Sequence, residues 1–537
     1  MKNNLKKFTL KFLFIAVFSS LIFPANAQFS FSEQGLKFIK LLNWLDEHYV
    51  DTVNVDKLTE SAIIELLQKL DPHSSYISKD EVNEMNEPLQ GNFEGIGVTF
   101  SIFRDTVMVI NPMPGGPSEK AGLKPGDRII QINDSNVSGV GIKTDDIFSK
   151  LRGKKGSIAT IKLKRKGSSE LLSFKIAREK IPIHSVEAVY KTEGDFGYIR
   201  ISRFSSNTIS EFKSALSKLK KQKINGLIID LSGNGGGFLD VAVNLADEFL
   251  DKEKLIVYTK GIHSEKKDYY TSGKGNFEKG HLVVIIDESS ASASEIFAGA
   301  IQDWDRGVLV GRRSYGKGLV QRPFVFPDGS MVRLTIARYF TPTGRLIQKS
   351  YSNGYKEYSK DILHRINSGS LTSEEKNQFV DTIKYYTLEK KRIVYGGGGI
   401  MPDVFVPIDT TSISSYIRSI LSKGILNQFV VKYIDDNRDK LSKKYKSFEI
   451  FNKEFPGKEP ILVSFLEYAQ TSGVKTDASL SDSTKEYLSM IIKAYISRDL
   501  WSNSEFYEIY NQTEEEYLAA VKILNNWQEY QVKLHLK

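Results

Sequence analysis

The spacing of apolar positions changes along the chain, and the changes mark regions of different fold. Residues 31–85 carry apolar side chains at helical spacing, which predicts a small helical module. After Gly91, short alternating apolar segments are separated by Gly- and Pro-rich turns, which is typical of a small β-rich domain. We expect two short helices inside that domain, at 118–121 and 144–151. From Thr411 the sequence is again helical and charged.

Between these regions, strand and helix patterns alternate. We expect strands at 196–201, 226–231, 255–260, 281–287 and 308–311, and helices at 209–219, 238–250 and 294–304. This order predicts an α/β layer with largely parallel strands. A hairpin follows, because 324–326 and 331–340 flank the turn residues Pro327-Asp328-Gly329. Residues 353–391 form a polar insertion rich in Lys and Glu.

The first 27 residues have the pattern of a secretory signal peptide: a lysine-rich start, an apolar run at 12–23, and Ala25-Asn26-Ala27 before Gln28. The apolar run is shorter than the ~20 residues that a membrane-spanning helix needs. An uncleaved anchor is the alternative, whereas a chain without cysteine cannot carry a lipoprotein anchor. We therefore expect export to the periplasm of a bacterium, with peripheral attachment to the membrane left open.

Charge and cysteine content exclude several classes of function. Removing residues 1–27 takes away four lysines and lowers the formal net charge from +9 to +5. Lys and Arg alternate with Asp and Glu over most of the chain, so we expect no nucleic-acid surface. The absence of cysteine excludes a thiol protease, disulfides and Cys-ligated zinc. No metal or other cofactor is expected.

Ser292 lies where an apolar strand turns into an amphipathic helix. Free amides and the helix dipole at such a position favour the negative charge that develops during acyl transfer, so the serine is a candidate nucleophile. The alternative is an ordinary capping box, formed by Ser292 and Glu295. None of the seven histidines stands in a motif that identifies it as the base. A Ser/His/Asp triad, for example with His73, stays open.

Lys317 is a better candidate base, because it lies between Gly316 and Gly318, just before an apolar strand. Burial in such a place lowers the pKa of a lysine, and a neutral amine can deprotonate a serine. The same segment nearly matches a phosphate-binding loop. However, Gly318 replaces the magnesium-binding hydroxyl, and Leu319-Val320 continues as a strand where that loop needs a helix. We therefore expect no nucleotide binding.

Two glycine clusters are candidates for binding through backbone amides. The strand that ends at Asp230 runs into Gly235-Gly236-Gly237, whose amides could complete an oxyanion hole. A flexible turn is the alternative. In the β-rich domain, Gly95-Ile96-Gly97-Val98 could present amides to a peptide carboxylate beside a strand edge. Here the alternative is a β-bulge.

Taken in order, these segments resemble the C-terminal processing peptidases, also called tail-specific proteases, over residues 36–408. The motifs that carry the resemblance are Leu70-Asp71-Pro72-His73-Ser74, Gly95-Ile96-Gly97-Val98, Ala121-Gly122-Leu123-Lys124-Pro125-Gly126-Asp127, the 230–237 turn, Ser290-Ala291-Ser292-Ala293-Ser294-Glu295, Gly316-Lys317-Gly318-Leu319-Val320-Gln321, Phe340-Thr341-Pro342-Thr343-Gly344-Arg345 and Gly399-Ile400-Met401-Pro402-Asp403. The resemblance implies that Ser292 is the nucleophile and Lys317 the base, and that Gln321 orients the lysine amine. It further implies oxyanion donors at Ala293 and one of Gly235 or Gly236.

The resemblance also implies an α/β multi-domain architecture, in which an α/β protease core holds an inserted β-rich PDZ domain between helical N- and C-terminal regions. The expected ranges are 1–27 for the signal peptide, 28–88 for the N-terminal helical region, 89–180 for the PDZ domain, 181–410 for the protease core with its insertion at 353–391, and 411–537 for the C-terminal helical region. Residues Gly95, Ile96, Gly97 and Val98 would bind the peptide.

The expected function is that of an exported serine endopeptidase whose partners are proteins or peptides with accessible C-terminal tails. A homodimer through the helical regions and an adaptor protein stay open as further partners. A catalytically inactive PDZ-containing scaffold is the alternative function. The sequence departs from the family pattern at Ser232, where arginine is usual, and at Gly235, where proline is common. No role can be transferred to 353–391 or to the C-terminal helical region.

Overall fold

The computed structural model describes residues 32–374, 383–408, 415–455, 460–474 and 480–534, so the expected signal peptide lies outside the described residues. The chain divides into two compact units, one up to Leu67 and the other from Gln68 to the C-terminus. The first unit contains helices α2 (Glu33–His48) and α3 (Val55–Gln68), as the apolar spacing predicts. Only Leu67 is buried in these two helices. A homodimer formed through the helical regions therefore remains a prediction from the sequence.

The second unit begins with a turn that does not continue the helical module. It leads into strand β1 (Ser75–Ile77) and helix α4 (Lys79–Gln90). Strand β1 pairs antiparallel with β18 (Met331–Phe340), far along the chain. The predicted helical module over 31–85 is therefore interrupted by β1, a short strand whose partner in the sheet, β18, the local sequence does not reveal.

The predicted β-rich domain is built on one antiparallel sheet. Its strands are β3 (Val98–Phe103), β4 (Thr106–Pro112), β5 (Arg128–Ile132), β6 (Ser135–Asn136), β7 (Ile158–Lys164) and β8 (Leu172–Ala177), with β3 at one edge. The predicted short helices are α5 (Pro117–Ala121) and α6 (Thr144–Leu151). Where the chain enters and leaves this domain, β2 (Asn92–Gly95) pairs antiparallel with β9 (Glu179–Pro182).

The predicted α/β layer is a six-stranded sheet. Its strands in order are β10 (Val186–Lys191), β11 (Phe196–Ile201), β12 (Gly226–Asp230), β15 (His281–Ile286), β16 (Val308–Gly311) and β21 (Val404–Phe405). All neighbours from β11 to β21 pair in parallel, whereas β10 is an antiparallel edge strand. Helices α7 (Thr208–Lys221), α8 (Leu239–Asp247) and α9 (Ala293–Asp303) share one hydrophobic core with this sheet.

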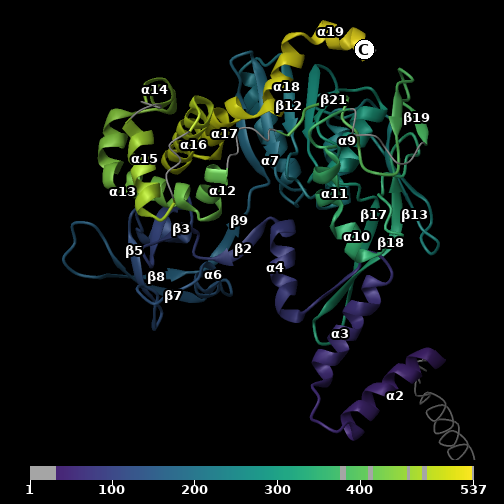
Figure 1. Cartoon of the computed structure of the whole chain (residues 1–537), viewed down its shortest axis with the longest axis horizontal. Helices are drawn as coiled ribbons and strands as arrows, with labels where there is room; N and C mark the ends of the chain where they lie inside the picture. Colours follow the sequence, from purple (N-terminus) through teal and green to yellow (C-terminus); the bar gives the residue numbers. More distant parts are fainter. Residues whose placement is uncertain (1–31, 375–382, 409–414, 456–459, 475–479, 535–537) are drawn as a thin grey trace, which may run out of the picture. The chain divides into compact units, whose positions relative to one another are not determined.

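The other face of this sheet is covered by the end of the chain. Helix α18 (Glu515–Asn525) packs Ile523 and Leu524 against Ile228 of β12 and Val283 of β15, and Trp527 of α19 (Trp527–Lys533) belongs to the same cluster (Figure 1). A parallel sheet needs helices on both faces. The preceding helices α12 (Ser415–Ser422), α13 (Ile425–Lys444), α14 (Phe448–Glu454), α15 (Pro460–Thr471), α16 (Asp482–Leu500) and α17 (Asn503–Tyr510) surround a separate core. The predicted C-terminal helical region therefore supplies part of the α/β layer.

A second, antiparallel sheet lies beside the α/β layer. It contains β1, β18, β13 (Leu255–Lys260) and β14 (Lys267–Tyr270), with β17 (Leu319–Val325) also paired to β18. The predicted hairpin is thus confirmed as β17 and β18. Strand β13 was expected in the parallel layer, and this expectation is wrong, because its neighbours are β14 and β18. An apolar run predicts a strand but does not identify the strands beside it.

The described residues of the polar insertion contain both helix and strand. They contribute helices α10 (Tyr355–Ser359) and α11 (Asp361–Ser368) and strand β19 (Lys384–Tyr386), which pairs with β20 (Ile393–Tyr395). Helix α11 buries Arg365 against the protein. Across the ranges that the structure describes, no helix has both the length and the apolar character needed to span a membrane.

Candidate active site

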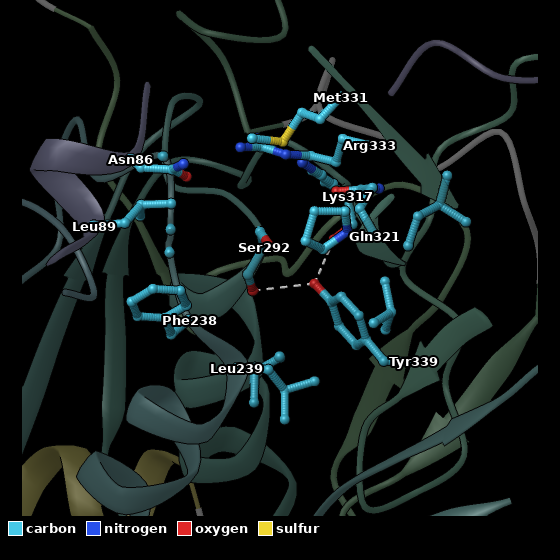
Figure 2. Close-up of a pocket in the computed structure, with 17 residues that line it drawn as sticks. Asn86, Leu89, Phe238, Leu239, Ser292, Lys317, Gln321, Met331, Arg333 and Tyr339 are labelled. Carbon is cyan, nitrogen blue, oxygen red and sulfur yellow. Dashed lines mark hydrogen bonds between the residues drawn. The ribbon is translucent and has the colours of Figure 1, made fainter. Parts of the chain in front are cut away.

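One pocket contains the predicted catalytic residues, although up to 86 positions separate them in the sequence. Ser292, Lys317, Gln321, Gly235 and Gly236 all line it, and its volume is about 380 Å³. Figure 2 shows Ser292 and Lys317 in its wall, both beside the hydroxyl of Tyr339. Ser292 follows β15 and Gly235 follows β12, so both lie at the carboxyl ends of parallel strands, where ligands of open α/β sheets bind.

Ser292 occupies the position just before helix α9, with φ 56° and ψ −110°. This left-handed φ is costly for a residue with a side chain and persists only where the surroundings enforce it. Two hydrogen bonds hold the turn: Ala291 N–H donates to the Asn234 carbonyl over 3.0 Å, and the Ser294 hydroxyl donates to the same oxygen over 2.9 Å. The strain therefore lies at the residue predicted to be the nucleophile.

Glu295 ties the serine turn to the lysine segment. Its carboxylate accepts hydrogen bonds from the N–H groups of Ser292, Gly316 and Lys317, at 2.8, 2.7 and 2.9 Å. The Ser314 hydroxyl also donates to it, over 2.5 Å. Burial raises the pKa of Glu295, while these donors act in the opposite direction. The capping-box interpretation is therefore correct for Glu295, but its carboxylate also fixes the backbone of Lys317.

Tyr339 is a second link, and no feature of the sequence predicts it. Its buried hydroxyl donates to the Ser292 carbonyl over 3.1 Å and to the Lys317 carbonyl, as the dashed lines in Figure 2 show. Tyr339 belongs to the apolar pattern of β18, where a tyrosine is an ordinary strand residue. Only the pairing of β18 with its neighbours brings the hydroxyl between the two carbonyls.

We expect Tyr339→Phe to reduce kcat about 10- to 100-fold and to cost about 1 to 2 kcal/mol of folding free energy. The ring keeps its packing, but two backbone carbonyls lose their shared donor. Steady-state kinetics and urea unfolding measure the two effects. Tyr258→Phe on the neighbouring strand β13 is the matched control, because Tyr258 does not line the pocket. Unchanged kcat in Tyr339→Phe would contradict a positioning role.

Lys317 has the electrostatic surroundings of a base. Burial lowers the pKa of its amine, and the positive charge of Arg333 acts in the same direction, whereas Glu295 and Asp71 act against them. No hydrogen bond among the described residues joins the Lys317 amine to the Ser292 hydroxyl. Catalytic hydrogen bonds are often long in sites without substrate and tighten when it binds. The two groups share a pocket but are not yet in hydrogen-bonding contact.

Gln321 lines the same pocket, but its amide is directed to a different partner from the one predicted. Its Nε2 donates to the Thr335 hydroxyl over 3.4 Å, and this hydroxyl donates to Asp71 Oδ1 over 3.1 Å. Within the described residues, Gln321 makes no hydrogen bond to Lys317. The predicted orienting contact is therefore not made in this conformation. The sequence could not show it, because Thr335 and Asp71 come from β18 and from the turn before β1.

The amides near Ser292 differ in their availability. Gly236 N–H donates to the side chain of Asn234 over 2.9 Å, whereas the N–H groups of Gly235 and Ala293 have no acceptor among the described residues. A methyl group on Gly236 would come within 2.7 Å of the Ala291 carbonyl and 2.9 Å of the Ala293 nitrogen. Only glycine therefore fits beside the serine. Of the two predicted glycines, Gly235 has the N–H that is free to bind an oxyanion.

His73 and the polar insertion support the lysine segment from outside the pocket. His73 Nε2 lies 2.7 Å from the Tyr358 hydroxyl of α10, and burial lowers the pKa of this histidine to about 4. Arg365 of α11 donates to the carbonyls of Arg313, Ser314 and Tyr315, just before Lys317. His73 does not line the pocket with Ser292. The insertion, to which no role could be transferred from the sequence, therefore holds the segment before Lys317 in place.

The predicted peptide-binding residues connect β2 to the edge strand β3. Gly97 has φ +68°, and a methyl group there would approach Ile181 to 2.9 Å, so this position also favours glycine. The Ile96 carbonyl accepts from the Ser118 hydroxyl over 2.6 Å, which fixes the loop to α5. The segment is therefore a connecting loop and not the β-bulge that was the alternative. Phe100 of β3 and Phe148 of α6 are in contact, with ring centroids 5.1 Å apart and the rings tilted by 59°.

Comparisons with known proteins agree with this arrangement. Residues 195–355 match the model of peptidase family S41, residues 108–165 match a PDZ domain, and residues 416–502 match a family of unknown function, DUF8443. The chain is similar to the carboxy-terminal processing protease CtpB of Bacillus subtilis, with 38% identity over 332 residues, which cover 61% of this chain and 68% of that protein. The chain belongs to peptidase family S41, the C-terminal processing serine proteases.

Other relatives carry related names. A probable CtpA-like serine protease of Staphylococcus epidermidis is 38% identical over 305 residues, which cover 56% of this chain and 61% of that protein. Among solved structures, a photosystem II D1 C-terminal processing protease is 30% identical and covers 59% of this chain and 91% of that one, with a TM-score of 0.34. The S41 match lies within the predicted protease core, and the PDZ match lies within the predicted PDZ domain.

Proposed function

We propose that this S41 protein is an exported endopeptidase that cleaves peptide bonds with Ser292 and Lys317. The observation that carries the proposal is the shared pocket: a serine in a strained turn at the start of α9, and a lysine whose pKa is lowered by burial. Glu295 and Tyr339 hold both backbones in place. No observation favours the inactive scaffold, since both reactive side chains are present.

The proposed reaction begins when the neutral amine of Lys317 accepts the proton of the Ser292 hydroxyl. The serine oxygen then attacks the scissile carbonyl carbon, and the carbonyl oxygen becomes an oxyanion. The N–H groups of Ala293 and Gly235 stabilise this charge. The lysine ammonium returns its proton to the departing amine, which leaves an ester on Ser292. A water molecule, deprotonated by the same amine, hydrolyses the ester and restores the serine.

The PDZ domain would select substrates by their C-terminal tail. The loop Gly95-Ile96-Gly97-Val98 would bind the carboxylate through its backbone, and the tail would add a strand beside β3, which is an edge strand of its sheet. A peptide with a free C-terminal carboxylate should then bind the Ser292→Ala protein about tenfold or more tightly than the same peptide amidated. Fluorescence anisotropy with labelled peptides measures this difference.

The matched control for this test uses two glycines with the same backbone strain. Gly97→Ala should weaken tail binding, because a methyl group there enters the loop against Ile181. Gly115→Ala should not, since Gly115 has a similar φ of +71° but open space around it. Equal binding of free and amidated peptides would contradict recognition of the carboxylate.

Export to the periplasm stays a proposal that rests on residues 1–27. Their lysine-rich start, short apolar run and Ala25-Asn26-Ala27 support cleavage before Gln28. The N-terminal residue of the protein purified from cells is the measurement that decides it. An intact Met1 in the secreted or periplasmic fraction would contradict cleavage.

A further inference from the structure

A second cavity lies between the α/β layer and the C-terminal helices, and the proposed reaction does not use it. Its volume is about 390 Å³. One wall comes from the carboxyl ends of parallel strands and the residues after them, including Asp230, Asp287 and Arg312. The opposite wall includes Tyr487 and Tyr495 of α16, which belong to the region that matches the family of unknown function. Cavities at this edge of an α/β sheet are where such folds bind ligands.

Three turns reach from this cavity into the active-site pocket. Ser232 lines the cavity, and Gly235 lines the pocket three residues later. Asp287 lines the cavity, and Ser292 lines the pocket five residues later. Arg312 lines the cavity, and Lys317 lines the pocket five residues later. Three segments of the catalytic pocket, those with Gly235, Ser292 and Lys317, therefore continue within five residues into the lining of the second cavity.

Hydrogen bonds make these connections stiff. Arg200 in the cavity donates to the Ser232 carbonyl over 2.8 Å. Asp287 accepts from Gly233 N–H over 3.0 Å and from Ser290 N–H over 2.9 Å, which joins the glycine turn to the serine turn. Groups that line the cavity therefore also hold the glycine turn and the serine turn of the catalytic pocket.

The charges of the cavity leave a place for a cation. Of its two arginines, Arg200 pairs with Asp230 over 2.5 Å, and Arg312 pairs with Glu288 over 2.6 Å and also with Glu516. Two further carboxylates of the lining, Asp287 and Glu514, take part in no ion pair among the described residues. The arginine charges are thus already compensated and Asp287 accepts from backbone N–H groups, whereas Glu514 has no ion-pair partner among the described residues.

Aromatic rings supply the remaining surface. The rings in the lining are those of Tyr487, Tyr495, Phe506, Tyr507, Tyr510 and Tyr517. Tyr510 lies stacked on Phe506 with centroids 5.3 Å apart, and Tyr495 lies 5.2 Å from Phe506. Aromatic faces together with a carboxylate are the surroundings that bind organic cations, because the ring faces carry negative potential.

We propose that this cavity binds a small organic cation, an alkylammonium or alkylguanidinium group, and that the bound cation changes the rate of peptide cleavage through the three shared turns. Its positive charge would lie beside Glu514, and its alkyl part against the tyrosines. The effect on cleavage rests on the proposed peptidase function, but binding does not.

Binding is tested by isothermal titration calorimetry on the full chain, with n-butylammonium and n-butylguanidinium chloride as probes and n-butanol as the uncharged probe of equal length. At least one cation should bind with a dissociation constant below about 1 mM, and butanol about tenfold more weakly or not at all. Equal affinity of the cations and butanol, or no binding of any probe, would overturn the proposal.

Two glutamates provide a matched pair of variants. Burial raises the pKa of both Glu514 and Glu508 to about 7, but only Glu514 lines the cavity. Glu514→Gln should weaken cation binding about tenfold or more, whereas Glu508→Gln should leave it unchanged. Equal losses in both variants would show a general effect of α17 and its surroundings and would overturn the assignment to the cavity.

The pH dependence follows from the groups that face Glu514. Burial, Glu516 and Asp230 raise the pKa of Glu514, whereas a hydrogen bond from Tyr510 and the charge of Arg200 lower it. A cation needs the ionised carboxylate, so affinity should increase between pH 6 and pH 8 in the wild-type protein and not in Glu514→Gln.

The effect on catalysis is measured separately. Saturating butylammonium should change kcat of the wild-type protein at least twofold and leave kcat of Glu514→Gln unchanged. An unchanged wild-type kcat would overturn the coupling. If the wild-type protein cleaves no peptide at all, the proposed function fails, while the calorimetry still decides whether the cavity binds cations.

Discussion

Ser292→Ala and Lys317→Ala should each reduce the rate of peptide cleavage by about 10⁴-fold or more. The first substitution removes the attacking oxygen, and the second removes the amine that accepts its proton. The two losses should not add in the double variant, because the groups act in one step. Alanine at position 292 keeps a β-carbon at the strained φ of 56°, so the fold around α9 should persist. Cleavage of a quenched fluorescent peptide, with circular dichroism of each variant, measures both points.

The pH profile of the wild-type protein tests the role of the lysine independently. Burial lowers the pKa of Lys317 below that of a free lysine, so its neutral fraction and the cleavage rate should increase with pH up to a plateau. Lys317→Arg is the matched substitution, since it keeps a long cationic side chain that does not lose its proton in this range. Substantial activity of Lys317→Arg, or a rate that peaks in acid, would contradict a lysine base.

Substitution of His73 tests directly whether a histidine, instead of Lys317, is the base. The imidazole lies against Tyr358 and does not line the pocket, and burial lowers its pKa to about 4, so it is a weak base. His73→Asn should therefore retain most of the cleavage rate, with a modest loss from the weakened lysine segment. A loss as large as that of Ser292→Ala would favour a histidine-dependent mechanism.

The elements could be predicted well because their signals are local. The run from 282 to 287 is almost entirely apolar and β-branched, and the structure places β15 at His281–Ile286. Helix α6 begins and ends at the predicted residues. In contrast, β14 has the sequence Lys-Asp-Tyr-Tyr, which carries no apolar alternation, so neither it nor the partner of β13 could be anticipated.

The candidate site was predictable to the extent that chemistry depends on residue type. A serine before a helix and a lysine between glycines can be recognised in the sequence, and the structure brings both into one pocket. The residues that position this serine and this lysine cannot be recognised from the sequence. Tyr339 acts through a hydroxyl whose partners are 22 and 47 residues away, and Arg365 acts on carbonyls about 50 residues away. Such partners become apparent only when the sheets are paired.

Glu295 shows how a local interpretation can be correct and still incomplete. A capping box accounts for its contact with Ser292, and the same motif occurs at Ser78 and Glu81 at the start of α4, on the surface. At α4 the glutamate contacts only its own cap. At α9 the carboxylate is fully buried and accepts from Gly316 and Lys317 as well. The same motif thus occurs twice: at α9 its glutamate is hydrogen-bonded to the Lys317 backbone, and at α4 it is not.

Glu295→Gln should reduce kcat about 100-fold and cost about 2 to 4 kcal/mol of folding free energy, because the new amide group places a donor against N–H donors in a buried site. Glu81→Gln should leave kcat unchanged and affect stability little. Steady-state kinetics and urea unfolding of both variants make the comparison. If the two substitutions have equal effects, Glu295 is only a helix cap. If kcat falls while the protein stays folded, the carboxylate is the group that holds the serine and the lysine in register.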